Sequence, residues 1–302
     1  MIPKAPRKPF LACIFVMAVL LAACGDADPV DARRYAGTDA LVQLMSGNLA
    51  AASGLRKIAD IDHARMAQDV GSPMPPARVL IISDTALEAQ LIKSSPLVAL
   101  DLPLRLLAFE SPAEQSARVT YNSFDYLVSR YQLSPEQTGD LRQFYESNIA
   151  ELTKGLPKEA IATFANDQMQ PDGIVTIQSP FGFEETRQRV NAAIDSQDDT
   201  VHFGVVDFQA DAKEQGIDIP PSYMILFGAP GPGGKAMADA PTLGLDGFCQ
   251  KFLLWQDEEG QTYLSFNDLM ALVERQDAGK SVALRVINFR LNKTFGDALA
   301  AD

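Results

Sequence analysis

The sequence predicts an α+β protein built from two repeated domains, each a mostly antiparallel sheet with helices on one face. Three observations predict this fold. The chain matches itself when it is shifted by 145 residues. Short runs that alternate apolar and polar residues, as strands do, are separated by helical runs and by proline or glycine. The composition, with 47% hydrophobic and 22% charged residues, is that of a globular chain.

The self-match rests on residue types that seldom coincide, among them a double proline, two aspartates and an asparagine. The matched pairs are Asp62 and Asp207, Pro75-Pro76 and Pro220-Pro221, Leu100-Asp101 and Leu245-Asp246, and Tyr121-Asn122 and Phe266-Asn267. One residue slips between Asp246 and Trp255. We therefore expect a duplicated domain of roughly 100 residues rather than a short-period solenoid.

The first 23 residues have the pattern of a lipoprotein signal peptide. Three basic residues precede an uncharged run of 14 residues, 10–23, which is short for a membrane-spanning helix of about 20 residues. The run ends Leu21-Ala22-Ala23-Cys24, which is typical of a bacterial lipobox. We expect cleavage before Cys24 and its acylation, for example with palmitate, since two or more chains anchor a protein stably. A plain secretory signal with an incidental cysteine is the alternative.

These features predict a lipoprotein of the bacterial cell envelope that faces the periplasm. Gly25 after the lipidated cysteine favours the outer over the inner membrane. With Cys13 removed and Cys24 acylated, Cys249 is the remaining thiol, so no internal disulfide is expected. The net charge of −13 argues against nucleic acid as a partner, because few groups could neutralise phosphates.

The domain organisation follows from the repeat. We expect a signal peptide over 1–23, a tether over 24–37, a first repeat domain over 38–133, a helical linker over 134–172, a second repeat domain over 173–277 and a C-terminal strand and tail over 278–302.

The second copy has the clearer pattern of elements. Alternation predicts strands, helical spacing predicts helices, and Pro220-Pro221 and Gly216 interrupt them. The expected order is a strand over 174–178, a helix over 182–196, a strand over 201–205, a short helix over 209–215, strands over 223–227, 251–255 and 262–266, and a helix over 267–275.

The linker between the copies is expected to be helical and packed. Ser134-Pro135-Glu136-Gln137 is a capping-box signature. An apolar stripe follows over 141–152, and helical spacing resumes over 158–166. Such a stripe needs a packing surface.

The first copy lacks an obvious opening strand, because residues 28–34 are mostly charged or polar. Residues 282–291 alternate beyond the end of the second copy and predict a spare strand. We expect this strand to fill the vacancy in the first sheet. An extra edge strand on the second sheet is the alternative.

The chain resembles the family named domain of unknown function 302. The first copy keeps Asp62-His63-Ala64, Ala99-Leu100-Asp101-Leu102-Pro103-Leu104 and Tyr121-Asn122, but reads Ile82-Ser83-Asp84-Thr85 where the family has Phe-Gly-Asn-Pro. The second keeps Phe227-Gly228-Ala229-Pro230 and Asn267 but has lost the Leu-Pro pair. Neither copy therefore holds the whole pattern.

The resemblance implies an α+β domain with a sheet backed by helices, and family members look like dimer-formers. A tandem chain is therefore implied to be its own internal pseudo-dimer, with two domains related by a pseudo-twofold axis. The resemblance implies no established activity, and the cofactor is unknown.

The glycine-rich segment 228–235 resembles a phosphate loop only superficially. The spacing to Lys235 is one residue too long, Ala236 replaces the hydroxyl, and prolines remove N–H donors. We expect a mobile loop over the sheet edge that could carry binding. Its candidate residues are Gly228, Pro230, Gly233 and Lys235.

The remaining candidates are polar residues that recur in both copies. The simplest interpretation makes Asp62 and Asp207 helix N-caps, Asp101 and Asp246 turn aspartates, and Asn122 and Asn267 helix caps. Cys249 is expected to be a buried small hydrophobe, with a reactive thiol as the alternative. With only two histidines and no metal-binding spacing, no zinc site is expected.

Three functional hypotheses remain open. The first is a non-catalytic envelope lipoprotein that binds a small molecule or an envelope protein in a cleft between the domains or under 228–240. The second is an enzyme in which Asp62, His63 and Asp101 share a pocket for acid–base work. The third is a structural interaction protein that docks through an exposed apolar face on 141–152.

Overall fold

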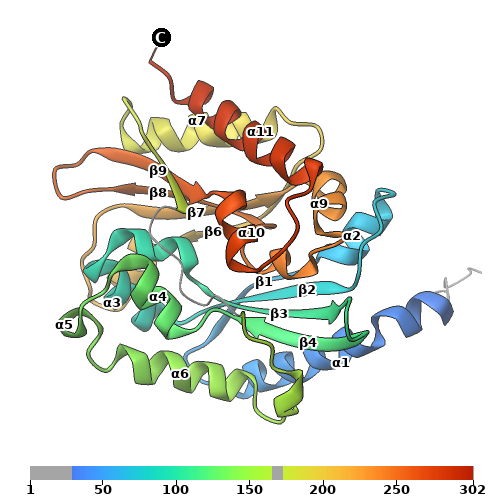
Figure 1. Ribbon diagram of the computed structural model, residues 1–302. Coiled ribbons are helices and arrows are strands. Elements are labelled where there is room, and N and C mark those ends of the chain that lie inside the picture. Colours follow the sequence, from blue (N-terminus) through green and yellow to red (C-terminus); the bar gives the residue numbers. More distant parts are fainter. Residues whose placement is uncertain (1–28, 165–172, 302) are drawn as a thin grey trace, which may run out of the picture.

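The computed structural model describes residues 29–164 and 173–301 and forms two antiparallel sheets flanked by helices (Figure 1). The predicted α+β class with two repeats is confirmed. Cys24 and the signal peptide lie outside the described residues. Within the described ranges, no helix is both long enough and apolar enough to cross a membrane.

The first half contains a four-stranded sheet in the order β1-β2-β3-β4. Its elements are α1 (Pro29–Ala51), β1 (Arg56–Asp62), α2 (His63–Asp69), β2 (Ala77–Ser83), α3 (Thr85–Ser94), η1 (Pro96–Asp101), β3 (Leu104–Ser111), β4 (Ser116–Tyr121), α4 (Phe124–Tyr131), α5 (Pro135–Thr138), α6 (Leu141–Leu152) and η2 (Lys158–Ala160).

The second half contains a five-stranded sheet in the order β5-β9-β8-β7-β6. Its elements are β5 (Ile174–Gln178), α7 (Phe183–Asp195), β6 (Val201–Asp207), α8 (Phe208–Glu214), β7 (Ser222–Gly228), α9 (Pro230–Met237), η4 (Pro241–Gly244), β8 (Gln250–Gln256), β9 (Thr262–Asn267), α10 (Leu269–Arg275) and α11 (Val282–Ala298). The strands predicted from alternation in this copy are confirmed.

Strand register shows how closely the two halves match. Val79 pairs with Leu107 in the first sheet, and Met224, 145 positions after Val79, pairs with Leu253 in the second. The first strand pair of each half also carries an irregularity at the equivalent place, between Lys57 and Ala59 and between His202 and Gly204. The one-residue slip therefore falls before β8.

The predicted C-terminal strand over 282–291 is wrong, because α11 occupies this segment. Its buried side chains, Leu284, Leu291 and Phe295, recur at helical spacing. Val282 and Val286 are exposed, and together with buried Leu284 they produced the false alternation. α11 packs on α7, as α6 packs on α1 (Figure 1).

In the described part of the chain, the first sheet has no strand equivalent to β5. A segment of the linker lies at that edge instead. In the second half β5 pairs with β9. At the corresponding edge of β4, Ile161 forms a single parallel bridge with Val119, and the Ala162 N–H donates to the Val119 carbonyl at 2.8 Å. The helix expected over 158–166 is reduced to η2, and 165–172 lies outside the described residues.

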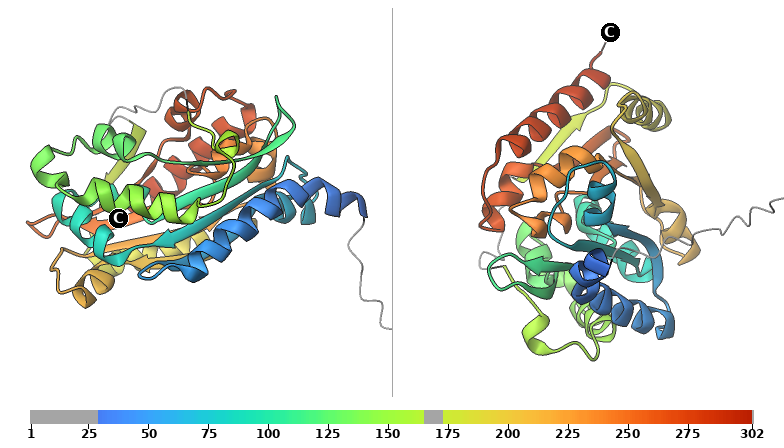
Figure 2. Two further views of the ribbon diagram at one scale, coloured as in Figure 1. Left: turned by 90° about the horizontal axis from the view of Figure 1, so that it is seen from below. Right: turned by 90° about the vertical axis from the view of Figure 1, so that its right-hand side faces the viewer.

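The tether predicted over 24–37 is also corrected, because α1 begins at Pro29 and runs along the first sheet (Figure 2). The stripe on α6 is buried at Leu141, Tyr145, Ile149 and Leu152. Only Phe144 of this stripe is exposed, so α6 lacks the apolar docking face that the third hypothesis requires.

The mobile loop predicted over 228–240 is replaced by helix α9, which packs on α2. A Cβ atom on Gly234 would lie 2.5 Å from the Ser72 carbonyl oxygen and 2.6 Å from the Ala67 Cβ. Glycine at this position therefore permits close helix packing.

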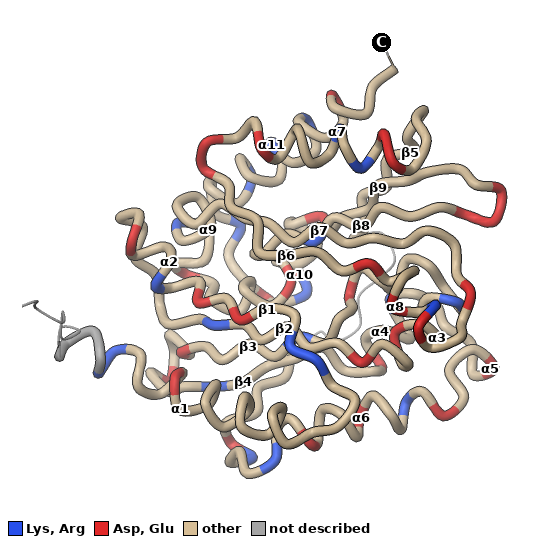
Figure 3. The backbone as a smooth tube through the Cα atoms, turned by 180° about the vertical axis from the view of Figure 1, so that it is seen from behind, with Lys and Arg blue, Asp and Glu red and all other residues tan. Residues whose placement is uncertain are grey.

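The two halves pack with exchanged contacts, as a pseudo-twofold relation requires. α2 packs on α9 and α3 on α8; η1 lies against β7, β8 and β9, and η4 against β2 and β3. One continuous apolar core runs through both halves. Acidic and basic positions are interleaved along both repeats (Figure 3).

Candidate functional site

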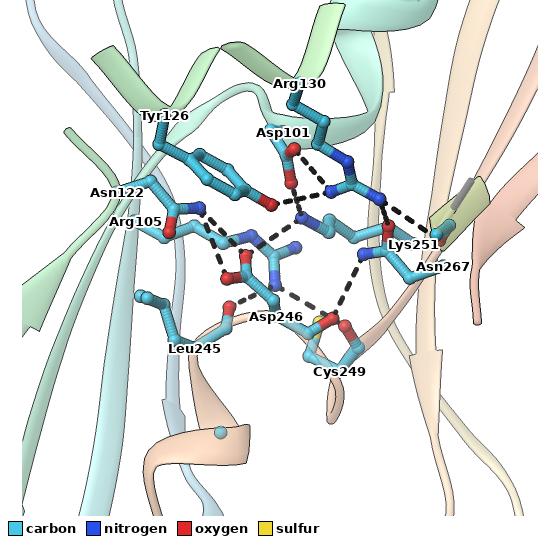
Figure 4. A network of polar contacts seen from close by, with 12 residues as sticks. Asp101, Arg105, Asn122, Tyr126, Arg130, Leu245, Asp246, Cys249, Lys251 and Asn267 are labelled. Carbon is cyan, nitrogen blue, oxygen red and sulfur yellow. Dashed lines mark hydrogen bonds and ion pairs between the residues drawn. The ribbon is translucent and has the colours of Figure 1, made fainter. Parts of the chain in front are cut away.

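Asp101 ends η1, and Asp246 follows η4 in the second repeat. The expectation that they bond local backbone is wrong. Because each 3-10 helix packs on the sheet of the other repeat, both carboxylates reach the centre of the molecule and have fully buried side chains (Figure 4).

Asp101 accepts three hydrogen bonds. Arg130 Nη1 donates at 2.6 Å, the Tyr131 hydroxyl at 2.7 Å and Lys251 Nζ at 2.8 Å. Burial by itself would raise the pKa of this carboxyl, but the charges of Arg130 and Lys251 outweigh it and hold the pKa well below its usual range. Asp101 is therefore ionised.

Asp246 has an equally dense set of partners. Asn122 Nδ2 lies 3.2 Å from both carboxylate oxygens, Lys251 Nζ lies 3.1 Å from Oδ1, and Arg275 Nη1 lies 3.2 Å from Oδ2. Lys251 thus bridges the aspartates of both repeats.

The asparagines are not helix caps, which corrects that interpretation. Ser123 caps α4 and Asp268 caps α10 instead. Asn122 binds Asp246, and Asn267 Oδ1 accepts from Arg130 Nη2 at 2.7 Å. Both asparagines therefore make polar contacts between the repeats.

These residues form the central cluster, which consists of equivalent pairs from the two repeats. Its members are Asp101 and Asp246, Asn122 and Asn267, Arg130 and Arg275, and Arg105 and Lys251. The cations were not predicted from the sequence, although Arg130 and Arg275 also lie 145 positions apart. The side chains of Asp101, Arg130, Asp246, Lys251 and Arg275 are at most 1% exposed. The cluster is therefore sealed and ties the repeats together.

Asp62 and Asp207 are N-caps, as predicted. The Asp62 carboxylate accepts from the Arg65 N–H and the Asp207 carboxylate from the Ala210 N–H, both at 2.9 Å. Asp62 also pairs with the Arg65 guanidinium. Since Asp101 lies in the sealed cluster, Asp62, His63 and Asp101 do not share a pocket.

His63 is buried at the start of α2, and its Nε2 lies 3.1 Å from the Gly244 carbonyl oxygen. Burial lowers the pKa of His63 to about 4, so the imidazole is neutral near pH 7. Cys249 is buried as expected and has a positive φ of 55°. Burial raises the pKa of this thiol, and the charge of Arg105 partly offsets the rise.

Two adjoining hollows surround the N-terminal half of α9, and we call them the α9 crevice. Both are lined by Gly228, Ala229, Gly233 and Phe248. The one that faces α2 has a volume of about 20 Å³ and adds His63, Met66, Phe203, Pro230, Met237 and Cys249. The one that faces α11 has a volume of about 40 Å³. Lys235 is exposed and lines neither hollow.

In the first repeat, a buried acid occupies the equivalent place. Glu88, at the position that corresponds to Gly233, accepts from the Ser83 hydroxyl at 2.9 Å and from the Asp84 N–H at 3.1 Å. Burial raises the pKa of Glu88 to about 8. The second repeat has Gly228, Ala229 and Gly233 at these three positions, and the crevice opens there.

Among the described residues, no three His, Cys, Asp or Glu side chains come together as a metal-binding group.

Comparisons place the chain among known proteins. It is 39% identical over 109 residues to the protein named Fluoride-specific ion channel FluC 1 of Brucella suis, with 36% of this chain and 42% of the relative covered. The same identity and share of this chain hold for FluC 1 of Brucella abortus, of which 40% is covered. The chain thus spans about two fifths of these curated relatives. An uncharacterized conserved protein from Bacillus stearothermophilus aligns with a TM-score of 0.35 and 18% identity, over 42% of this chain and 95% of that one.

The two repeats are matched separately by one family model. It is described as Domain of unknown function DUF302, and it matches residues 33–152 and again 175–292. These segments include most of the chain, and the chain therefore belongs to the DUF302 family.

Proposed function

We propose that this protein is a non-catalytic binding protein of the bacterial envelope that holds a small ligand in the α9 crevice. The observation that carries the proposal is that both repeats line this crevice, while the equivalent place in the first repeat is filled by Glu88. Ligand sites occur preferentially where two domains meet.

The arrangement of ionisable groups supports binding rather than acid–base catalysis. A general acid or base must reach its substrate within hydrogen-bond distance. The Asp101 carboxylate is sealed from solvent, and Asp62 is engaged with the Arg65 backbone and side chain. Of the proposed catalytic trio, only His63 lines the crevice.

The envelope location is supported by the lipobox pattern that ends at Cys24. A Cys24→Ser substitution in the full chain should prevent acylation, and the protein should leave the membrane fraction of the bacterial cell. Intact-mass spectrometry of the purified protein checks the lipid directly. Unchanged mass and membrane association would exclude this anchor, and density-gradient separation of the two membranes tests the preference for the outer one.

Binding is tested by a thermal-shift screen of the full chain against metal ions, haem, small metabolites and fluoride, the last because of the relatives' names. Ala229 lines both hollows, so Ala229→Leu should fill them and abolish the shift caused by any true ligand. Ala210→Leu on the exposed face of α8 is the matched control and should keep the shift. A shift that survives Ala229→Leu would place the ligand elsewhere.

A further inference from the structure

We infer that the hollow between α9 and α2 binds a soft monovalent metal ion of the Cu(I) class, through His63, Met66, Met237 and Cys249. All four side chains line this one hollow. The inference rests on the proposed binding function and names the chemical class of its ligand.

The four donor residues converge because the repeats pack against each other. His63 and Met66 lie three positions apart on α2, and residues at that spacing share a helix face. Met237 ends α9, and Cys249 directly precedes β8. α2 packs on α9, so donors from both repeats meet in one hollow.

The histidine tautomer suits a metal ligand. A carbonyl oxygen can only accept, so Nε2 carries the proton that is donated to Gly244. Nδ1 then keeps its lone pair, and the bond from Nε2 fixes the ring, as hydrogen bonds to the non-ligating nitrogen of metal-binding histidines do.

The donor set selects the class of ion. Thiolate and thioether sulfurs prefer Cu(I), whereas Mg²⁺ and Ca²⁺ require oxygen ligands. None of the residues that line this hollow is a carboxylate. A volume of about 20 Å³ is close to the 10–15 Å³ that a single water needs, so it suits an ion better than a metabolite.

Charge favours a monovalent ion over a divalent one. The Cys249 thiol releases its proton to solvent as the metal–sulfur bond forms, and no electron is transferred. A thiolate with a monovalent ion is neutral, whereas a divalent ion would leave an uncompensated charge in a buried site. Arg105, whose Nη1 lies 3.4 Å from the Cys249 carbonyl oxygen, already contributes a positive charge there.

The fold does not require these residue types. At the positions equivalent to His63, Met66 and Met237, the other repeat has Phe208, Asp211 and Ile92. None of these offers a soft donor. The donor set is therefore present at the contact of α2 with α9 and absent from the equivalent contact of α8 with α3. Cys249 also holds a left-handed backbone conformation, which is uncommon for a non-glycine residue and often marks a functional site.

The test uses the full chain with Cys13→Ser and Cys24→Ser, so that Cys249 is its one thiol. An anaerobic titration with Cu(I), competed against bicinchoninate, should give one ion per chain with thiolate-to-copper absorbance. Ag(I), which is redox-inert, should raise the melting temperature.

Met66→Leu with Met237→Leu should weaken Cu(I) binding by roughly tenfold or more, as should His63→Phe, which copies the residue of the other repeat. Met45→Leu with Met74→Leu, at two buried methionines outside the hollow, is the matched control and should bind as the parent does. Equal affinity in the Met66/Met237 variant and the parent would overturn the assignment, even if Cys249→Ser fails to fold.

The outcomes separate this inference from the proposed function. No binding of Cu(I) or Ag(I), together with a different ligand whose shift is lost in Ala229→Leu, would overturn the metal assignment and leave the binding function standing. If the screen finds no ligand whose shift is lost in Ala229→Leu, both the metal assignment and the binding function are overturned.

Discussion

The segment that follows the second strand differs sharply between the two repeats. In the first repeat Ser83, Asp84 and Glu88 bond to one another and fill the space at the start of α3. In the second repeat, Gly228 and Gly233 occupy the positions equivalent to Ser83 and Glu88, and a crevice opens there. One folding unit has therefore produced a solid interior in one copy and a cavity in the other.

The central cluster shows the opposite behaviour, because three of its four equivalent pairs have the same residue type in both repeats. Each supplies an aspartate, an asparagine and an arginine, and Lys251 joins the two aspartates. What the repeats share thus holds the pseudo-twofold interface together, and what they do not share is available for a specific ligand.

The largest effect is expected from breaking the shared cluster. Asp101→Asn would leave Arg130 and Lys251 buried against a neutral amide. Removing one partner of a buried ion pair costs about 3–5 kcal/mol, because the remaining charge is uncompensated. Denaturant titration of the full chain measures this loss.

Asp218→Asn, an exposed position in the second repeat, is the control and should change stability by less than about 0.5 kcal/mol. A loss below about 1 kcal/mol for Asp101→Asn would contradict the role of the central cluster in holding the repeats together.

The next effect concerns the two equivalent helix contacts. Gly234→Ala should cost about 1–3 kcal/mol, because the added Cβ would meet the Ser72 backbone and Ala67 at less than 3 Å. The equivalent residue of the first repeat is Ala89, and Ala89→Gly should cost only about 1 kcal/mol, its helix-propensity loss. Thermal melts of both variants compare the two contacts. Equal losses would show that α9 does not pack more closely on α2 than α3 does on α8.

The buried acid of the first repeat should make stability depend on pH. The pKa of Glu88 is about 8 in the folded chain because of burial, against 4.5 ordinarily. The folded state therefore holds a proton that the unfolded state has lost, and stability falls as pH rises from about 4.5 to 8, by up to ~1.4 kcal/mol per unit.

Urea unfolding between pH 6.5 and 8 isolates this effect, since His63 is neutral in both states over most of that window. Glu88→Gln should flatten the curve there. An equally steep decline in the Glu88→Gln variant would assign the pH dependence to another group.

The sequence predicted the fold well where local pattern and the repeat agreed. Strand alternation and Pro220-Pro221 located the second sheet because both are local signals. The pattern failed at 282–291, where exposed Val282 and Val286 flank buried Leu284 on a helix. The strand period of two residues and the helix period of about 3.6 residues both fit such a short run, and only packing against α7 distinguishes them.

The candidate site was predicted only in part, for a related reason. Asp101, Asp246, Asn122 and Asn267 were all singled out because they recur, and they do meet. Lys251 was not, because a lysine within an apolar strand has no local sign of a buried partner from the other repeat. The crevice adjoins the segment 228–240, under which a cleft was expected. Its contrast with the first repeat was not predicted, because that contrast depends on aligning Gly233 with Glu88.

The remaining effect lies on the acid side, at the crevice. The pKa of His63 is lowered to about 4 by burial, from 6.5 ordinarily. The unfolded chain therefore binds a proton at a higher pH than the folded chain does. Stability should fall as pH drops from 6.5 towards 4, by up to ~1.4 kcal/mol per unit. The Glu88→Gln background removes the opposing trend of Glu88 in that range. In this background His63→Phe introduces the residue type of Phe208, the equivalent position of the second repeat. This variant should show no acid-side decline in stability, and circular dichroism should show that it keeps the fold. A decline that is unchanged in His63→Phe would mean that another group titrates and that His63 is not held neutral at the crevice.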